Sequence, residues 1–504
     1  MVSRIRSFAT YGIEALEVKV EVDAGRGLPG TVIVGLPDSA VKESKERVRS
    51  AIVNSGYPFP AKKIVVNLAP ADLKKEGTLY DLPIALGILA STGLVREDTV
   101  SNYLVAGELG LGGEVNPVKG ILPAAFLAKE LGLEGIVVPL KNAEEALLVG
   151  GIKVYPVKSL VEAVAFFNGD LRIEPATPER VADAADYDVD LSDIVGQYQA
   201  KRALEIAAAG RHNLFMVGPP GSGKTMLARR LPTIMPPMTE EEVIETSKVY
   251  SVAGLFNEVP VTRRPFRSPH STASDVSLIG GGANVRPGEV SLAHNGVLFL
   301  DELPEFKRSV LEALRQPLED RKVTISRASG TYTFPADFSL ICAANPCPCG
   351  YYGFSDGVHY CSCSPYQIKR YMGKISGPIL DRIDIYVSVP AVKPEELKKG
   401  SGGESSEKVR GRVIKAHEIQ KRRFRERKIN FNAQMGRREI KEFCKLSKEA
   451  EEALTKAVKA FGLSARAYDR VLKLSRTIAD LDGSDVIDVA HVAEAISYRS
   501  TIPV

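Results

Sequence analysis

Hydrophobic and polar positions along the first part of the chain change repeatedly between a two-residue period and a helical period. The two-residue period is typical of strands, and an apolar stripe at helical spacing is typical of helices packed on a sheet. Strands are predicted at 15–22 and 63–68, and helices at 37–55, 82–91 and 122–131. A mixture of this kind predicts an α/β or α+β domain over residues 1–172.

The pattern changes three times after this first domain. Residues 173–190 are acidic and contain alanine and proline, which predicts an exposed linker. Residues 191–390 return to alternating helix and strand patterns, whereas 391–407 are rich in Lys, Gly, Ser and Glu and predict a flexible hinge. Residues 408–504 have helical periodicity without strand-like runs. We therefore expect a multidomain α/β protein with a helical domain at its end.

Length and composition agree with several soluble domains. The chain has 504 residues, of which 44% are hydrophobic and 25% charged, and 504 residues exceed what one hydrophobic core organises. The longest apolar runs, such as 84–90, are too short to span a bilayer. No apolar segment of the secretory type follows the first ten residues, so a cytoplasmic protein without membrane contact is expected.

A phosphate-binding loop lies between a predicted strand at 213–217 and a following helix. Its residues are Gly218, Pro219, Pro220, Gly221, Ser222, Gly223, Lys224 and Thr225. The glycines allow backbone N–H groups to surround phosphates at the start of a helix. Lys224 is expected to reach the β- and γ-phosphates of ATP, and the Thr225 hydroxyl to bind Mg²⁺.

Two further predicted strands end in polar residues that suit ATP hydrolysis. The apolar strand 297–300 precedes Asp301 and Glu302. Asp301 is expected to hold Mg²⁺, and Glu302 to act as the general base for the attacking water. The strand 338–344 ends at Asn345, which is expected beside the γ-phosphate. The alternative, a core strand ending in two solvated acids, is weak given the phosphate loop upstream.

These motifs resemble the magnesium-chelatase-like branch of the AAA+ ATPases. The resemblance rests on 195–197, 218–225, 300–302, 344–346 and 377–384. It implies that Gln197 lies beside the nucleotide and that Asn345 is the family's sensor. It also implies that Arg382 is a finger acting on a neighbouring subunit, with a local salt bridge to Asp381 or Asp384 as the alternative. For the second sensor, on the helical lid, it implies Arg466, with Arg470 as the second choice.

The whole chain resembles the ComM/YifB family, through segments 33–38, 66–72 and 80–83 in the first domain. This implies a homo-hexameric, ATP-driven DNA motor for branch migration in recombination and natural transformation. The first domain also resembles the proteolytic domain of Lon-type proteases (ribosomal S5 domain 2-like). No serine lies near 80–83, so the domain is expected to be a non-catalytic scaffold or DNA-binding platform.

Two other functions share the ATPase core. One is the ATPase subunit of a metal chelatase, and the other is a protein-remodelling AAA+ machine. The first domain and a cysteine cluster favour the DNA motor over the chelatase subunit. The absent serine argues against proteolysis.

Two groups of residues in the core suggest further contacts. Four cysteines form two C-x-C pairs and suit a structural Zn²⁺, the alternative being free thiols. They are Cys347, Cys349, Cys361 and Cys363. A predicted hairpin, 323–334, and the two residues before it carry basic side chains that suit DNA phosphates, the alternative being a hairpin with solubilising charges. They are Arg321, Lys322 and Arg327. The segment 263–287 resembles the family's pore insertion.

Overall fold

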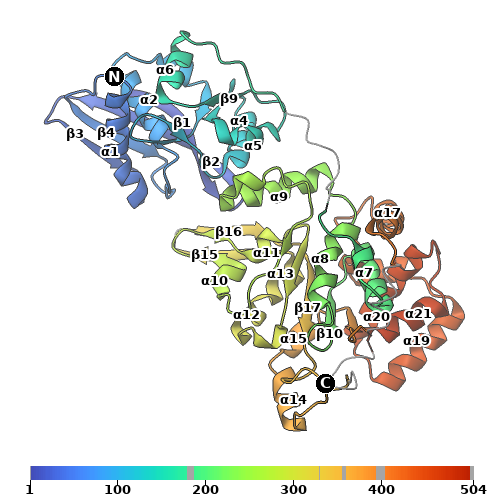
Figure 1. Cartoon of the computed structure of the whole chain (residues 1–504). Coiled ribbons are helices and arrows are strands. Elements are labelled where there is room, and N and C mark those ends of the chain that lie inside the picture. The colour runs from blue at the N-terminus through green and yellow to red at the C-terminus, as the bar shows by residue number, and fades with distance from the viewer. Residues whose placement is uncertain (1, 179–186, 329, 355–358, 393–402, 500–504) are drawn as a thin grey trace.

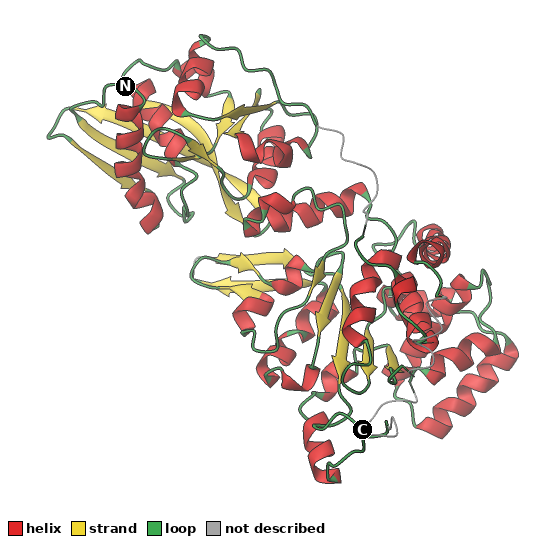
Figure 2. Cartoon of the chain, in the orientation of Figure 1, coloured by secondary structure: helices red, strands yellow, loops and turns green. Residues whose placement is uncertain are grey.

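The computed structural model describes residues 2–178, 187–328, 330–354, 359–392 and 403–499. They form an N-terminal α/β domain, a core built on a parallel sheet, and a helical lid (Figure 1). Figure 2 shows two separate groups of strands, one in each of the first two parts. The predicted multidomain α/β class is therefore confirmed. Within the described residues, no helix combines the length and apolar character needed to cross a membrane.

The N-terminal domain contains a seven-stranded sheet in the order β3-β4-β2-β1-β5-β8-β9. Its strands are β1 (Val2–Tyr11), β2 (Glu14–Gly25), β3 (Gly30–Val34), β4 (Lys63–Ala69), β5 (Tyr103–Val105), β8 (Gly135–Pro139) and β9 (Val154–Val157). Its main helices are α1 (Ser39–Asn54), α2 (Asp81–Ser91), α4 (Ile121–Glu130), α5 (Ala143–Leu147) and α6 (Leu160–Asn168). β1, β2 and β4 pair antiparallel, and the other pairs are parallel. All five elements predicted from the hydrophobic pattern of this domain are present, with ends shifted by at most three residues.

Alternation in β2 places Val18, Val20 and Val22 on the buried face, where α2 covers them. A Cβ on Gly87 would lie 2.6 Å from Cγ2 of Val22, so glycine permits this close approach of the helix to the sheet.

The core sheet has five parallel strands in the order β11-β14-β17-β10-β18. They are β11 (Phe266–Arg267), β14 (Val297–Leu300), β17 (Ser339–Ala344), β10 (Leu214–Val217) and β18 (Ile385–Ser388). Every residue of β10, β14 and β17 is buried, as expected for a parallel sheet covered on both faces. The principal helices around it are α7 (Tyr198–Gly210), α8 (Lys224–Ile234), α9 (Glu240–Ala253), α12 (Arg308–Ala313), α13 (Arg315–Asp320) and α14 (Pro365–Met372).

Two small hairpins extend from the core. The longer, β15 (Lys322–Arg327) with β16 (Gly330–Pro335), is the predicted one, and residue 329 of its turn lies outside the described residues. The shorter pairs β12 (Gly280–Gly281) with β13 (Arg286–Pro287), within the segment expected to be a pore insertion. The two lie side by side, because a Cβ on Gly281 would be 3.3 Å from a terminal guanidinium nitrogen of Arg327.

The lid consists of α17 (Ser406–Arg423), α18 (Arg437–Phe443), α19 (Lys448–Phe461), α20 (Ala465–Leu481) and α21 (Val489–Ser497). Apolar residues of α17 and α20 share one hydrophobic core with α7 and α8, so the lid is packed against the sheet domain. The predicted hinge ends earlier than expected, because α17 begins at Ser406. Residues 393–402 of that hinge and 179–186 of the predicted linker lie outside the described residues. The described ends of both segments meet, since the backbone N–H of Ser406 donates to Asp190 Oδ2 at 3.1 Å.

The N-terminal domain contacts the core through the turn between β1 and β2 (Figure 1). The rings of Tyr11 and Tyr332 lie 4.8 Å apart, and the backbone N–H of Thr331 in β16 donates to the Tyr11 hydroxyl at 3.2 Å. Gly12 has a φ of 64°, and a Cβ there would lie 2.8 Å from the carbonyl oxygen of Thr333. The N-terminal domain therefore contacts the β15–β16 hairpin directly.

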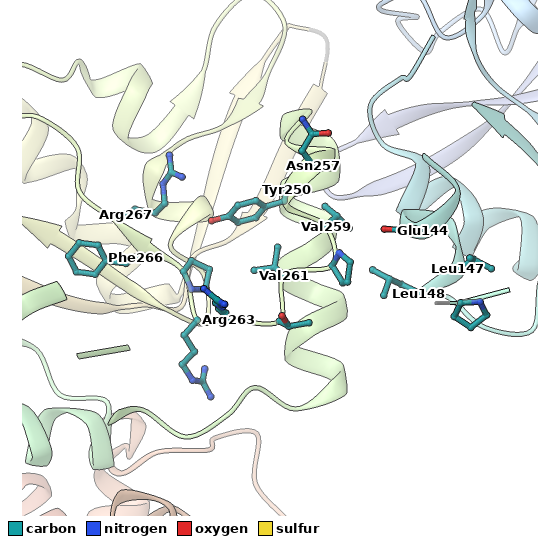
Figure 3. Close-up of a pocket in the computed structure, with 15 residues that line it drawn as sticks. Glu144, Leu147, Leu148, Tyr250, Asn257, Val259, Val261, Arg263, Phe266 and Arg267 are labelled. Carbon is teal, nitrogen blue, oxygen red and sulfur yellow. The ribbon is translucent and has the colours of Figure 1, made fainter. Parts of the chain in front are cut away.

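A second contact lies between α4 and α9, beside a cavity of about 800 Å³ (Figure 3). The backbone N–H of Gly120 donates to the carbonyl of Ser251 at 3.1 Å. Glu144 and Leu148 line the cavity from the N-terminal domain, and Tyr250 and Arg263 line it from the core. It is separate from the phosphate loop, none of whose residues lines it.

Candidate nucleotide-binding site

The phosphate loop leaves the carboxyl end of β10 and enters α8 at Lys224. Gly221 and Gly223 have φ values of 72° and 91°, a region that favours glycine. A Cβ on Gly218 would lie 2.0 Å from the carbonyl oxygen of Val389, so the backbone that follows β18, the strand beside β10, leaves no room for a side chain. The loop therefore adopts the turn that presents its N–H groups to phosphate.

The side chain of Lys224 lies inside this loop. Its Nζ donates to the carbonyls of Gly218 and Pro219, each at 2.8 Å, and to Asn345 Oδ1 at 3.2 Å. Burial lowers the pKa of Lys224 to about 8, against the attraction of Asp301 and Glu302. The predicted lysine and asparagine are thus brought together at one point.

The parallel register explains why three polar residues converge here. Val217 is opposite Ala344, and Leu300 is opposite Cys342, so β10, β14 and β17 end at the same edge of the sheet. The Thr225 hydroxyl donates to Asp301 Oδ2 at 2.7 Å. A hydroxyl and a carboxylate in this arrangement fit Mg²⁺, which prefers oxygen ligands and, when bound there, would neutralise phosphate charge.

Glu302 has a strained backbone, with a φ of 51° in a non-glycine residue. Its N–H donates to Asp301 Oδ1 at 2.9 Å, and its exposed side chain lines a hollow together with Asn345. This places a carboxylate where it can accept a proton from water attacking the terminal phosphate.

Gln197, at the start of α7, also contacts the loop. Its Nε2 donates to the carbonyls of Ser222 at 3.3 Å and Pro390 at 2.6 Å. It thereby joins the phosphate loop to the segment that follows β18. Its place beside a bound nucleotide stays a prediction.

The predicted finger Arg382 lies at the opposite edge of the sheet. It precedes β18, and its carbonyl accepts from Asn213 Nδ2 at 2.9 Å, directly before β10. The phosphate loop begins at the other end of β10, a strand of roughly 13 Å at 3.3 Å per residue. Arg382 therefore cannot reach the nucleotide of its own subunit.

Arg382 forms its ion pair with Glu319, not with Asp381 or Asp384 as the alternative interpretation expected. Its Nη1 also donates to the carbonyl of Pro378 at 2.6 Å. Burial, and then repulsion from Arg315, Arg470 and Arg466, lowers the pKa of Arg382. Sequence reasoning did not identify Arg315 and Glu319 as neighbours, because no local motif marks them.

Both candidate lid arginines lie in this same cluster. Arg470 Nη1 contacts Asp384 Oδ1 at 2.6 Å, whereas the exposed Arg466 lies 4.0 Å from Asp381. Burial opposes ionisation of Asp384, but Arg470 and His212 outweigh it and hold its pKa below the usual range. The structure thus brings Arg382, Arg466 and Arg470 together, away from Lys224.

The four cysteines form a compact group beside the phosphate loop. Their sulfur atoms all lie within 4.8 Å of one another. Individual Sγ–Sγ distances are 3.3 Å for Cys347–Cys349, 3.8 Å for Cys347–Cys361 and 3.7 Å for Cys349–Cys361. Tetrahedral zinc, with Zn–S bonds of about 2.3 Å, requires sulfurs about 3.8 Å apart, so the group fits this metal. A Cβ on Gly350 would lie 2.5 Å from Cδ of Pro220, which places the group against the loop.

Of the three basic residues predicted to contact DNA, two lie at opposite ends of the longer hairpin. Lys322 and Arg327 are exposed on β15, near its base and its tip respectively. Arg321 lies outside the hairpin, half-buried at the end of α13 with a φ of 56°. Among the three, Arg327 is therefore best placed to project from the core.

The state of Lys224 predicts a pH dependence of nucleotide binding. Bound phosphate favours the charged ammonium and raises the pKa of Lys224 above its free value of about 8. Below that pH the lysine is charged in both states, and affinity is constant. Above it, binding requires uptake of a proton, so affinity should fall by up to about tenfold per pH unit.

Calorimetric titration with ADP at about pH 7 and about pH 9, in buffers of different ionisation enthalpy, measures this uptake. Lys224→Arg stays charged at both values and should abolish the dependence. Equal proton uptake by the arginine variant would contradict the assignment to Lys224.

Comparisons with known proteins agree with this site. Residues 190–397 match the family described as magnesium chelatase, subunit ChlI. Residues 20–142 match subunit ChlI of Mg-chelatase, and 403–499 match the ChlI C-terminal family. The core is thus a magnesium-chelatase-like AAA+ domain, which implies an ATPase.

The chain is similar over nearly its whole length to bacterial proteins. It is 46% identical to competence protein ComM of Haemophilus influenzae, covering 99% of this chain and 97% of that protein. It is 45% identical to the uncharacterized protein YifB of Escherichia coli, with coverage of 99% and 97%. A partial match, 30% identical over 186 residues, relates 31% of this chain to Lon protease 2 of Bacillus subtilis. Full-length similarity at this level shows that the chain belongs to the ComM/YifB family of magnesium-chelatase-like AAA+ proteins.

Proposed function

We propose that this chain is a homo-hexameric, ATP-driven motor that acts on DNA and drives branch migration. The observation that carries the proposal is the division of the hydrolytic groups between two edges of one sheet. Lys224, Asp301, Glu302 and Asn345 lie at the carboxyl edge, and the cluster around Arg382 lies at the amino edge. A ring of subunits places one edge against the other and completes each site.

In this mechanism each of these residues has a separate role in hydrolysis. Lys224 neutralises the β- and γ-phosphates, and Asn345 orients the terminal phosphate or the water. Glu302 accepts the proton of the water as it attacks. Arg382 of the neighbouring subunit stabilises charge on the transferred phosphoryl group, with Arg466 or Arg470 beside it.

DNA as the substrate is supported by two observations. A relative similar over the whole chain is a competence protein, a name that concerns uptake of DNA. In addition, Lys322 and Arg327 are exposed on a hairpin that projects from the core. The N-terminal domain, which contacts that hairpin through Tyr11, acts as a non-catalytic platform in this proposal.

The test is the ATPase rate with and without single-stranded and four-way-junction DNA, with Lys224→Ala as the blank. Stimulation by DNA that is lost in the variant, followed by movement of a junction in a branch-migration assay, is the expected result. A rate that is indifferent to every DNA would overturn the DNA motor and leave the ATPase assignment standing.

The ATPase subunit of a metal chelatase is the second candidate, favoured by the family descriptions of all three matched segments. The first domain does not argue against it, contrary to the sequence-based expectation, because residues 20–142 match a family carrying the ChlI name. Stimulation of hydrolysis by a chelatase partner in place of DNA would select this function.

We also propose that the four cysteines bind structural Zn²⁺. Protein purified without chelators should contain a stoichiometric amount of zinc, and Cys361→Ser with Cys363→Ser should remove the zinc and lower the Tm by several degrees. Elemental analysis and thermal unfolding measure the two effects. Cys444→Ser is the control, since this buried thiol lies in the lid core. Reduced protein free of zinc would contradict the proposal.

A further inference from the structure

A hollow of about 560 Å³ opens where the ends of β14 and β17 face α14. Glu302 and Asn345 line it from the sheet. Gln367, Arg370, Tyr371 and Lys374 line it from α14 and the residues after it. Because Glu302 and Asn345 are placed for the attacking water and the γ-phosphate, the terminal phosphate of bound ATP faces this hollow.

The start of α14 is fixed beside the cysteine group. Cys363 directly precedes Ser364, which caps the helix: the backbone N–H of Gln367 donates to Ser364 Oγ at 3.3 Å, and that of Ser364 to Gln367 Oε1 at 2.8 Å. From this cap, Gln367, Arg370 and Tyr371 follow at positions i, i+3 and i+4, which share one helix face. That face is turned to the hollow.

Two acidic and two basic side chains line the hollow, but only one ion pair forms among them. Lys374 Nζ lies 3.4 Å from a carboxylate oxygen of Glu305, so these two groups neutralise each other. Arg370 is exposed and has no hydrogen-bond or ion-pair partner within the described part of the chain. An unpaired guanidinium with several donors, facing the place of a phosphate, is suited to bind it.

We propose that Arg370 contacts the γ-phosphate of ATP bound to its own subunit. It would add a cation from α14, in addition to Lys224 from the phosphate loop, and it would distinguish ATP from ADP. The inference rests on the nucleotide site of the proposed function, and it is independent of DNA and of the direction in which Arg382 acts.

Calorimetry on the full-length chain with Mg²⁺ tests this contact, using ADP and a non-hydrolysable ATP analogue. Arg370→Ala should weaken the analogue by about tenfold, as expected for loss of a charged hydrogen bond, and leave ADP within about twofold. Arg370→Lys should recover part of the loss. Unchanged ADP binding also shows that the variant is folded.

Lys369→Ala is the matched control, because Lys369 is the adjacent exposed cation on α14 and does not line the hollow. It should bind both nucleotides as the native chain does. Equal losses for Lys369→Ala and Arg370→Ala, or equal losses of ADP and the analogue, would overturn the proposal. A native chain that binds neither nucleotide would overturn the nucleotide site itself, whereas absence of DNA stimulation would affect only the motor.

Discussion

Glu302→Gln should slow ATP hydrolysis by about 10²–10⁴-fold while ATP still binds. Glutamine has the size and hydrogen-bonding reach of glutamate, but it cannot accept a proton from water. The backbone N–H of residue 302 donates to Asp301 Oδ1 at 2.9 Å and holds the strained backbone in place. The side chain therefore stays in the hollow whether it is glutamate or glutamine. Phosphate release and nucleotide titration measure the two effects separately.

Glu305→Gln provides the matched control for this prediction. Glu305 is exposed in the same hollow, but it is paired with Lys374 and belongs to the short turn that follows β14. Loss of an exposed ion pair has a small effect, so hydrolysis should stay within about threefold of the native rate. If Glu305→Gln stopped hydrolysis and Glu302→Gln did not, the assignment of the general base would be wrong.

The carboxyl-edge site was predictable from sequence because each of its parts is local. A loop between a buried strand and a helix identifies Lys224 and Thr225, and apolar strands that end in polar residues identify Asp301 and Asn345. In a parallel sheet those strand ends meet, so the pattern alone places the residues together. The parallel direction of the strands is enough to predict that these residues form one site, without knowledge of the long-range packing.

The amino-edge cluster was not predictable in the same way. Its members come from three distant segments, α13, the residues before β18, and α20. Only the packing of the lid on α7 and α8 brings Arg470 to Asp384. Glu319, on α13, meets Arg382 across a separation of 63 residues. The family resemblance pointed to the three arginines. It did not predict which residues they pair with, or that all three lie at the amino edge of the sheet.

The contact between the N-terminal domain and the hairpin also could not be predicted from the sequence. Tyr11 and Tyr332 lie more than 300 residues apart and belong to no motif. Their contact depends on the orientation of two separately folded domains, which hydrophobic periodicity within each domain does not encode.

Arg382→Ala should reduce hydrolysis by about 10³-fold or more, as for removal of an arginine finger, while each subunit retains nucleotide binding. The guanidinium lies one strand length from its own phosphate loop, so its loss affects the site of a neighbour. Mixing Arg382→Ala subunits with Lys224→Ala subunits should therefore restore activity. One variant supplies an intact loop, the other supplies an intact arginine, and a complete site forms where they meet.

Glu319→Gln separates this role from the local ion pair. It removes the negative partner of Arg382 but keeps the guanidinium, so hydrolysis by the ring should persist, with a modest loss of stability measured by thermal unfolding. If mixed Arg382→Ala and Lys224→Ala subunits stayed inactive in assembled rings, the arginine would not act between subunits. The separation of the two edges would then require another cation from the neighbour, and Arg315 and Arg466, which lie in the same cluster, would be the next residues to replace.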